Sequence, residues 1–353
     1  MYILQPSLFS FEDWLEIDSS DRLPLFFAVL DLQPYASKLR KQSPQGAKPM
    51  NREAILRALL AAPLEGISTF TRLHERLARD IRFRYQCGFR IDEAAPSVSR
   101  LSRVFSAVVE LGLAEKLFID LVSQCKEASI INGRHLAVDT ASELPVALDV
   151  TPANVFDGEM AAPLLEHVVT THGWEIDFVM MDAGYDQVKN YEMVRQYGAQ
   201  AIIAMNKRGE KEPPEGIASD GTPRCTMGYD MVYWGADGDR LKFRCPHAVG
   251  KVDCPLGIAT CSESNYGMVV KKRITEDIRR YCAPHRGTQN WKLLYNERTA
   301  VERCNARLKT NLTANDVHVR GIRKVKTYMF LNAIVLLASA LAVNHIERHK
   351  KTA

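Results

Sequence analysis

The alternation of strand-like and helix-like segments between residues 135 and 204 is the feature that most limits how this chain can fold. HLAVDTA (135–141) and LPVALDVT (144–151) are short and apolar or β-branched, and a turn-like Ser-Glu pair separates them, which predicts a hairpin. A helical pattern then ends at Gly173 and is followed by the apolar strand FVMM, the helix DQVKNYEMVRQYG and the strand-like GAQAIIAM. This order predicts an α/β fold, a mixed sheet flanked by helices.

The residues before this alternation have a helical pattern. Apolar side chains recur at helical spacing in 51–64, 70–89 and 98–125, so residues 1–127 are predicted to form an all-helical N-terminal domain. Ser97, which follows Pro96, is a predicted N-cap. Arg100 and Arg103 fall early in the helix that follows, as in the second helix of a helix-turn-helix that grips DNA. A helical scaffold with surface arginines fits the same spacing.

Residues 206–290 interrupt the alternation with Pro213-Pro214, several glycines and short aromatic strands, which indicates an insertion. Four of its cysteines are candidates for a structural zinc site: Cys225, Cys245, Cys254 and Cys261. Their spacings lack the close C-x2-C pairs of zinc knuckles, although a small loop-rich subdomain gains most from a metal. Free buried thiols are the alternative.

A polar stripe marks the segment Tyr295–Lys309, YNERTAVERCNARLK. Tyr295, Arg298, Glu302 and Lys309 stand at offsets 0, 3, 7 and 14, which places all four within roughly 60° on a regular α-helix. A carboxylate between two cations and a phenol suits a site where a metal ion meets phosphates. An exposed helix with an ordinary i,i+4 ion pair is the alternative.

The spacing Tyr-x2-Arg-x3-Glu-x6-Lys resembles the signature of a group of bacterial insertion-sequence transposases of the DDE class. Residues 144–204, with DAGYD after the strand FVMM, resemble the middle of the same catalytic domain, and the N-terminal 130 residues resemble the helical region before it. The resemblance implies a ribonuclease H-like mixed sheet. We therefore expect four regions: an N-terminal domain at 1–127, the catalytic domain at 128–205, a cysteine-containing insertion at 206–290, and C-terminal helices completing the catalytic domain at 291–353.

Three acids are expected to hold two Mg²⁺ ions, or Mn²⁺, in this class, because such ions prefer carboxylate oxygens and stabilise the reacting phosphate. Glu302 on the polar stripe and Asp182 at the exit of FVMM are the first two candidates. Asp139, in HLAVDT, is the third. The family has three strands before the helix at 154, whereas residues 129–152 have room for two. Either Asp139 has taken over the leading position, or the chain is a shortened, inactive transposase remnant that only binds DNA.

The resemblance further implies that Tyr295, Arg298 and Lys309 contact the DNA backbone, and we add Arg303 and Arg307 on the same helix as candidates. The segment from Lys271 to Lys326 contains fifteen Lys or Arg residues and five acids. Its net charge is therefore +10, in a chain whose net charge is +4. A basic segment of this kind suits a polyanion. The expected partners are double-stranded DNA, as element ends and target, and a second copy of the chain. A ribonuclease H-like nuclease that does not join strands would differ only in its products.

Two further observations concern location. The N-terminus lacks a basic start and eight cysteines carry no disulfide pattern, which predicts a cytoplasmic protein. Residues 328–343 are almost wholly apolar, but sixteen residues fall short of the roughly twenty needed to span a bilayer. We therefore expect no membrane contact, and a core helix packed on the sheet.

Overall fold

The computed structural model describes residues 15–18, 20–39, 50–131, 138–152, 154–155 and 157–352. The chain forms two compact units, and each is built from separate stretches of sequence. The first consists of residues 1–132, 141–152 and 303–353, and the second of residues 133–140 and 153–302.

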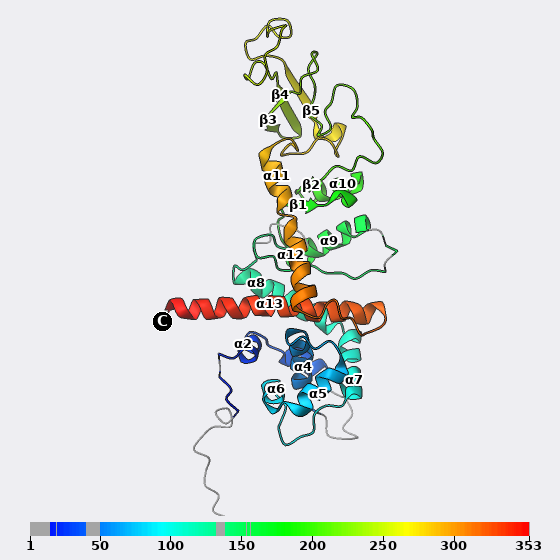
Figure 1. Cartoon of the computed structure of the whole chain (residues 1–353), viewed down its shortest axis with the longest axis vertical. Helices are drawn as coiled ribbons and strands as arrows, with labels where there is room; N and C mark the ends of the chain where they lie inside the picture. Colours follow the sequence, from blue (N-terminus) through cyan, green and yellow to red (C-terminus); the bar gives the residue numbers. More distant parts are fainter. Residues whose placement is uncertain are drawn as a thin grey trace, which may run out of the picture. The chain divides into compact units, whose positions relative to one another are not determined.

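The first unit is helical (Figure 1). Its helices in chain order are α2 (Arg22–Ala28), α3 (Gln33–Lys38), α4 (Arg52–Leu64), α5 (Phe70–Arg79), α6 (Ile81–Gln86), α7 (Val98–Glu110), α8 (Leu113–Glu127) and α13 (Ile322–Thr352). The core lies where α13 packs on α8 and α4, and among the largest fully buried side chains there are Phe118, Leu121 and Ile55.

Capping residues decide where these helices begin and end. Ser97 is the N-cap of α7, as predicted, and its hydroxyl accepts from the backbone N–H of Arg100 at 3.4 Å. The predicted helix over 70–89 is broken at Asp80, whose carboxylate accepts from Phe83 N–H and starts α6. The predicted helix over 98–125 is broken at Gly112, which has a left-handed conformation with φ 60°.

The connection before α7 differs from a helix-turn-helix. It runs from Cys87 to Ser97, whereas such motifs join their helices by a turn of about three or four residues. Gly88 and Pro96 near its two ends, and the exposed Asp92 and Glu93 between them, disfavour a helix in this segment. The prediction that α7 follows the short turn of a helix-turn-helix is therefore wrong, although α7 does carry Arg100 and Arg103 in its first two turns.

Helix α13 is a core helix, but its partners are not those we expected. It packs mainly on α8 and α4 of the helical unit rather than on a sheet. Among the described residues it is the one helix long and apolar enough to cross a bilayer, a test that the core helix of a globular protein also passes. Its apolar face is buried, with Ala333, Ile334 and Leu337 fully covered.

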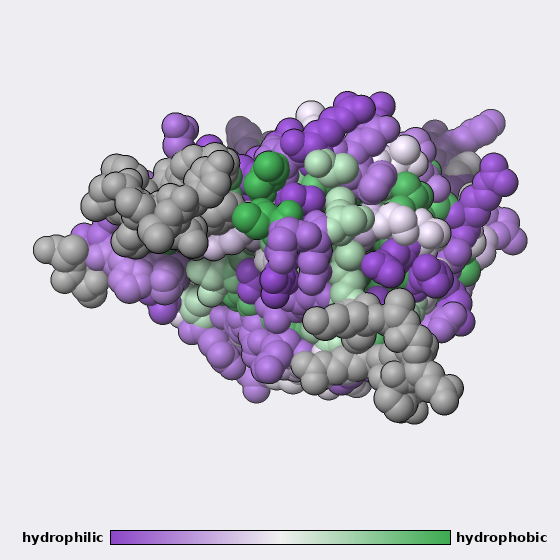
Figure 2. Space-filling model, turned by 90° about the horizontal axis from the view of Figure 1, so that it is seen from below, coloured by the Kyte–Doolittle hydropathy of each residue, from purple (hydrophilic) through white to green (hydrophobic). Residues whose placement is uncertain are grey.

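Figure 2 shows one face of the molecule, which is mainly hydrophilic with smaller apolar areas.

The second unit contains the predicted strand–helix–strand alternation. After the short helix η1 (Asp157–Glu159) come α9 (Ala161–His172), β1 (Phe178–Met181), η2 (Ala183–Tyr185), α10 (Val188–Gln196) and β2 (Gln200–Ile203). Strands β1 and β2 are parallel, with Phe178 opposite Gln200 and Met181 opposite Ile203. The buried Val179, Ile202 and Ile203 explain why these two runs are apolar.

The described part of the predicted hairpin, residues 138–151, contains no strand. Residues 135–137 lie outside the described residues, and the rest of this segment shows only single bridge positions, at Val138 and Pro145. Pro145 lacks an N–H to donate, which limits pairing there. The described part of the chain is therefore α/β with small sheets.

A second sheet lies in the predicted insertion, at the upper end of Figure 1. It consists of the antiparallel strands β3 (Val232–Asp237), β4 (Arg240–Arg244) and β5 (Val269–Arg273), and the short helix η3 (Ile274–Glu276) follows. A small core of Met231, Leu241, Phe243 and Tyr281 supports it.

The segment expected to be one helix from Tyr295 to Lys309 is divided into three. Helix α11 spans Gln289–Asn296, α12 spans Thr299–Ala306, and η4, a π-helix, spans Arg307–Asn311. Backbone bonds of the i→i+3 type around Glu297 and Arg298 tighten the chain between α11 and α12. The prediction of one regular helix is therefore wrong, because a constant 100° per residue holds only in a regular α-helix, although Arg298 contacts both Tyr295 and Glu302.

Candidate active site

Asp182 stands at the exit of β1, as the sequence predicted. It is the N-cap of η2, and its Oδ1 accepts from the backbone N–H of Gly184 at 2.7 Å. The side chain is nonetheless exposed. A β-carbon at position 184 would lie 3.0 Å from Oδ1 of Asp182, so the glycine allows this close turn. The turn fixes one carboxylate oxygen by a backbone bond.

Glu302 lies on α12 and is paired with Arg298. The guanidinium donates to Oε1 of Glu302 at 2.8 Å, and the side chains are 26% and 61% exposed. Burial opposes the charge of Arg298. The bond to Glu302 and the negative charges of Glu302 and Asp182 outweigh this effect, and the pKa of Arg298 is raised. Arg298 therefore binds Glu302 and is also stabilised in its charged form by the negative charge of Asp182.

An aromatic ladder holds Arg298 in place. Trp291 and Tyr295 on α11 stack with ring centroids 4.9 Å apart and planes 9° apart, and Arg298 lies 5.6 Å from the Tyr295 ring. Trp291 is buried with Ile202 of β2. The ladder therefore fixes Arg298 to the parallel sheet. Trp291 was not singled out from the sequence, although it stands four residues before Tyr295, a spacing that places two side chains on one helix face.

The Asp139 segment reaches the same region through its neighbour. Thr140 donates from its hydroxyl to Oε2 of Glu297 at 3.3 Å, and Glu297 directly precedes Arg298. Asp139 itself is fully buried and has interactions of its own. Glu302 thus binds Arg298 directly, the negative charge of Asp182 acts on Arg298, and the Asp139 segment contacts Glu297 through Thr140; two of the three carboxylates are exposed and one is buried.

No group of three or more His, Cys, Asp or Glu side chains gathers to hold a metal ion within the described residues. The donor chemistry of Asp182 and Glu302 fits a hard divalent cation, and Arg298 binds only one of the two oxygens of Glu302. Ligation by all three acids would require that Asp139 become exposed.

A buried ion pair behind Asp182 was missed by the sequence analysis. Asp186, the last residue of DAGYD, is fully buried and is bound by Arg279 at 2.6 Å and 3.2 Å, by the Tyr191 hydroxyl at 2.9 Å and by Asn206 N–H at 2.8 Å. Burial raises the pKa of this carboxyl, but the bonds from Arg279, Asn206 and Tyr191 prevail and hold it below its ordinary value. The pair anchors the turn that presents Asp182. The sequence did offer one signal for this pair, because Asp186 is a second acid four residues after Asp182.

Of the remaining predicted DNA contacts, two arginines have protein partners. Arg303 and Arg307 both reach Glu143, and the Arg307–Glu143 ion pair measures 3.5 Å. Lys309 is exposed on η4 and has no ion pair within the described residues.

In the first unit the positive charges of Arg100 and Arg103 act on Arg52, whose pKa is lowered by burial and by these two neighbours. Arg52 was not predicted from the sequence.

Two protein-family models match the chain. A family model described as "Transposase DDE domain" matches residues 131–338, more than half of the chain, and a second, "Transposase domain (DUF772)", matches residues 10–107. The chain belongs to the DDE transposase family. No curated protein and no solved structure matches it.

The four cysteines suggested for zinc lie between β2 and α11 of this transposase and do not gather in threes. Thr226, next to Cys225, places its hydroxyl 3.7 Å from the Cys261 sulfur, while Cys254 N–H bonds to Nδ1 of His247. Cys245 packs beside Gly267. Zinc at these residues stays a prediction, and the arrangement of the sulfurs does not yet fit one ion.

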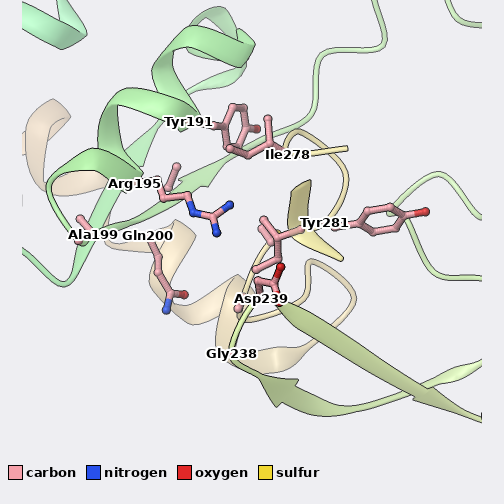
Figure 3. Close-up of a pocket in the computed structure, with 13 residues that line it drawn as sticks. Tyr191, Arg195, Ala199, Gln200, Gly238, Asp239, Ile278 and Tyr281 are labelled. Carbon is pink, nitrogen blue, oxygen red and sulfur yellow. The ribbon is translucent and has the colours of Figure 1, made fainter. Parts of the chain in front are cut away.

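The transposase also has a pocket of about 250 Å³ between β2 and the insertion (Figure 3). Arg195 points into its middle, and Gln200 and Asp239 lie at its wall, while the Tyr281 ring points away. Asp139, Asp182 and Glu302 do not line it. The pocket is therefore separate from the acidic site.

Proposed function

We propose that the chain catalyses Mg²⁺-dependent cleavage of DNA at the ends of an insertion element and transfer of those ends to target DNA. The observation that carries this proposal is the bond between Arg298 and Glu302, together with the charge of Asp182 that acts on Arg298 and the contact of Thr140 with Glu297. Family membership supports the class of reaction, and these contacts support the choice of residues.

Asp139, Asp182 and Glu302 would hold the metal ions in this proposal. Bound Mg²⁺ activates the attacking oxygen and stabilises the negative charge on the reacting phosphate. Arg298 would hold phosphate oxygens beside the carboxylates, since guanidinium matches phosphate geometry and stays charged. Tyr295 keeps Arg298 in position and Lys309 extends the contact along the backbone.

The wider organisation follows from the same proposal. We infer a ribonuclease H-like catalytic domain at 128–205 and 291–353, an insertion at 206–290 and a DNA-binding N-terminal domain at 1–127. The Arg52, Arg100 and Arg103 group would bind the element end, because its three positive charges have no carboxylate partner among the described residues. Two element ends require two active sites, so a homodimer on DNA in the cytoplasm is expected.

Purified protein and labelled duplexes carrying the element ends test the proposal. With Mg²⁺ we expect free 3′ ends and, with added target DNA, joined products. Glu302→Gln and Asp182→Asn should each reduce product by on the order of a hundredfold or more, because losing a metal ligand removes stabilisation of the transition state. Mn²⁺ should support the same reaction.

Glu192→Gln is the matched control, since Glu192 is also an exposed helical glutamate of the second unit and should leave the products unchanged. If wild type and Glu302→Gln both leave the DNA intact, the proposal fails, and the inactive remnant that only binds DNA takes its place. The covered carboxylate of Asp139 is the observation that favours this second candidate. Cleavage without joined products would instead indicate a nuclease.

A further inference from the structure

The insertion sheet has one basic face. Side chains alternate between the two faces of a strand, and Leu241 and Phe243 of β4 are fully buried in the small core. Arg240, Lys242 and Arg244 therefore share the opposite face. This face is called the outer face below.

The strand register extends the outer face across the sheet. Arg273 stands opposite Arg240, and Lys271 stands opposite Lys242. Lys272, between them, belongs to the core side, where it pairs with Glu276 at 3.5 Å and lies 5.9 Å from the Tyr281 ring. The cations of the outer face are Arg240, Lys242, Arg244, Lys271 and Arg273.

These cations repel one another in the folded sheet. Like charges directly opposite each other in an antiparallel pair destabilise a sheet, and two such pairs occur side by side here. Arg240, Lys271 and Arg273 are exposed, and none of the five forms an ion pair with an acid within the described residues. Asp237 is the one acid at a strand position of this face. A negatively charged partner would remove the repulsion.

Aromatic rings close one end of the outer face. The Arg244 guanidinium lies 4.3 Å from the Trp234 ring and 3.3 Å from the Tyr266 ring, and Lys242 donates to the Tyr266 hydroxyl at 3.0 Å. Trp234 is 49% exposed at the point where the β3–β4 register shifts. The rings fix the basic face, because they hold Arg244 by cation–π contacts on a rigid strand.

We propose that the outer face of the β3–β4–β5 sheet binds the phosphate backbone of duplex DNA, at a site separate from the acidic residues. Cations at alternate positions stand about 6.8 Å apart along each strand, so the outer face offers phosphate groups a regular array of positive charge. Because backbone contacts carry no base information, the binding is independent of sequence. The inference rests on the proposed action on DNA.

The test compares two full-length triple variants that each remove three positive charges. The face variant is Arg240→Gln/Lys271→Gln/Arg273→Gln. The control is Lys207→Gln/Lys211→Gln/Lys251→Gln, which changes exposed lysines of the same unit away from the sheet. Fluorescence anisotropy with a labelled duplex of unrelated sequence, and with an element-end duplex, measures affinity over a range of salt concentrations without Mg²⁺.

We expect the face variant to bind both duplexes on the order of tenfold or more weakly. The slope of log affinity against log salt should become shallower by about 2 to 3, since each phosphate contact contributes about 0.9. Its thermal midpoint should equal or exceed that of the wild type, because the repulsion is gone. Equal effects of the face and control variants would overturn the inference.

The proposed function can fail independently. Glu192→Gln should retain the affinity and the salt slope of the wild type, since it leaves both the outer face and the acidic residues intact. A protein that cleaves DNA but whose face variant binds as well as the control refutes only the inference. A protein whose face variant loses affinity but whose wild type produces no cleavage refutes only the proposed activity.

Discussion

Replacing Arg279 by Met should destabilise the second unit more than any exposed ion pair can. Asp186 is fully buried and the Arg279 side chain is 21% exposed, so the substitution leaves a covered carboxylate without its cation. Two opposite charges about 4 Å apart attract each other by ~4 kcal/mol at an effective dielectric constant of 20. Removing one partner of a buried pair typically costs ~3–5 kcal/mol. Because Arg279 is partly exposed, we expect a loss of about 3 kcal/mol.

Urea unfolding followed by tryptophan fluorescence measures this loss, because Trp174, Trp234 and Trp291, three of the four tryptophans, lie in the second unit. Arg224→Met is the matched control. Arg224 pairs with Asp230 at 2.9 Å with 44% and 58% of the side chains exposed, and its loss should cost ~0.2–1 kcal/mol. A loss below about 1 kcal/mol for Arg279→Met would refute the reasoning. The double variant Arg279→Met/Asp186→Asn should lose less stability than the sum of the losses of the two single variants.

Two further predictions concern pH and the helical unit. The pKa of Asp186 lies below its unfolded value of about 4, so its contribution to stability is present above this pH and is lost as pH falls through the lower folded pKa. Urea titrations should therefore show the difference between wild type and Asp186→Asn shrinking below about pH 4 and constant above it. Asn332→Leu should lower the free energy of unfolding by ~2–4 kcal/mol in thermal melts, because the buried Thr313 N–H and hydroxyl lose their acceptor. Ser339→Ala on the same helix is the control and should change it by less than ~0.5 kcal/mol.

The sequence predicted elements whose signals are local. Ser97 and Gly173 were identified as helix boundaries because N-caps and left-handed C-caps depend on the residue itself. Strands β1 and β2 followed from short apolar runs on either side of a helix. Asp182 was identified for the same reason, since it directly follows one of these runs.

Features that depend on distant contacts could not be predicted. Asp186 and Arg279 are 93 residues apart, so no local pattern connects them. The apolar residues of α13 predicted burial but not the partner, because a helix that is hydrophobic on all sides carries no information about what covers it. The division of the predicted helix over 295–309 was missed because neither the tight turn at Glu297 nor the π-helix after Ala306 has a strong sequence signal.

The discontinuity of the helical unit has a consequence for the order in which the chain is made. The buried faces of α4 and α8 are synthesised about two hundred residues before α13, the helix that covers them. On the ribosome these faces remain without their main partner until Ile322–Thr352 has emerged, since domains otherwise fold as they are produced. A nonsense codon or frameshift before residue 322 would therefore leave apolar surface open to chaperones and proteases, so truncated copies should be removed quickly from the cell.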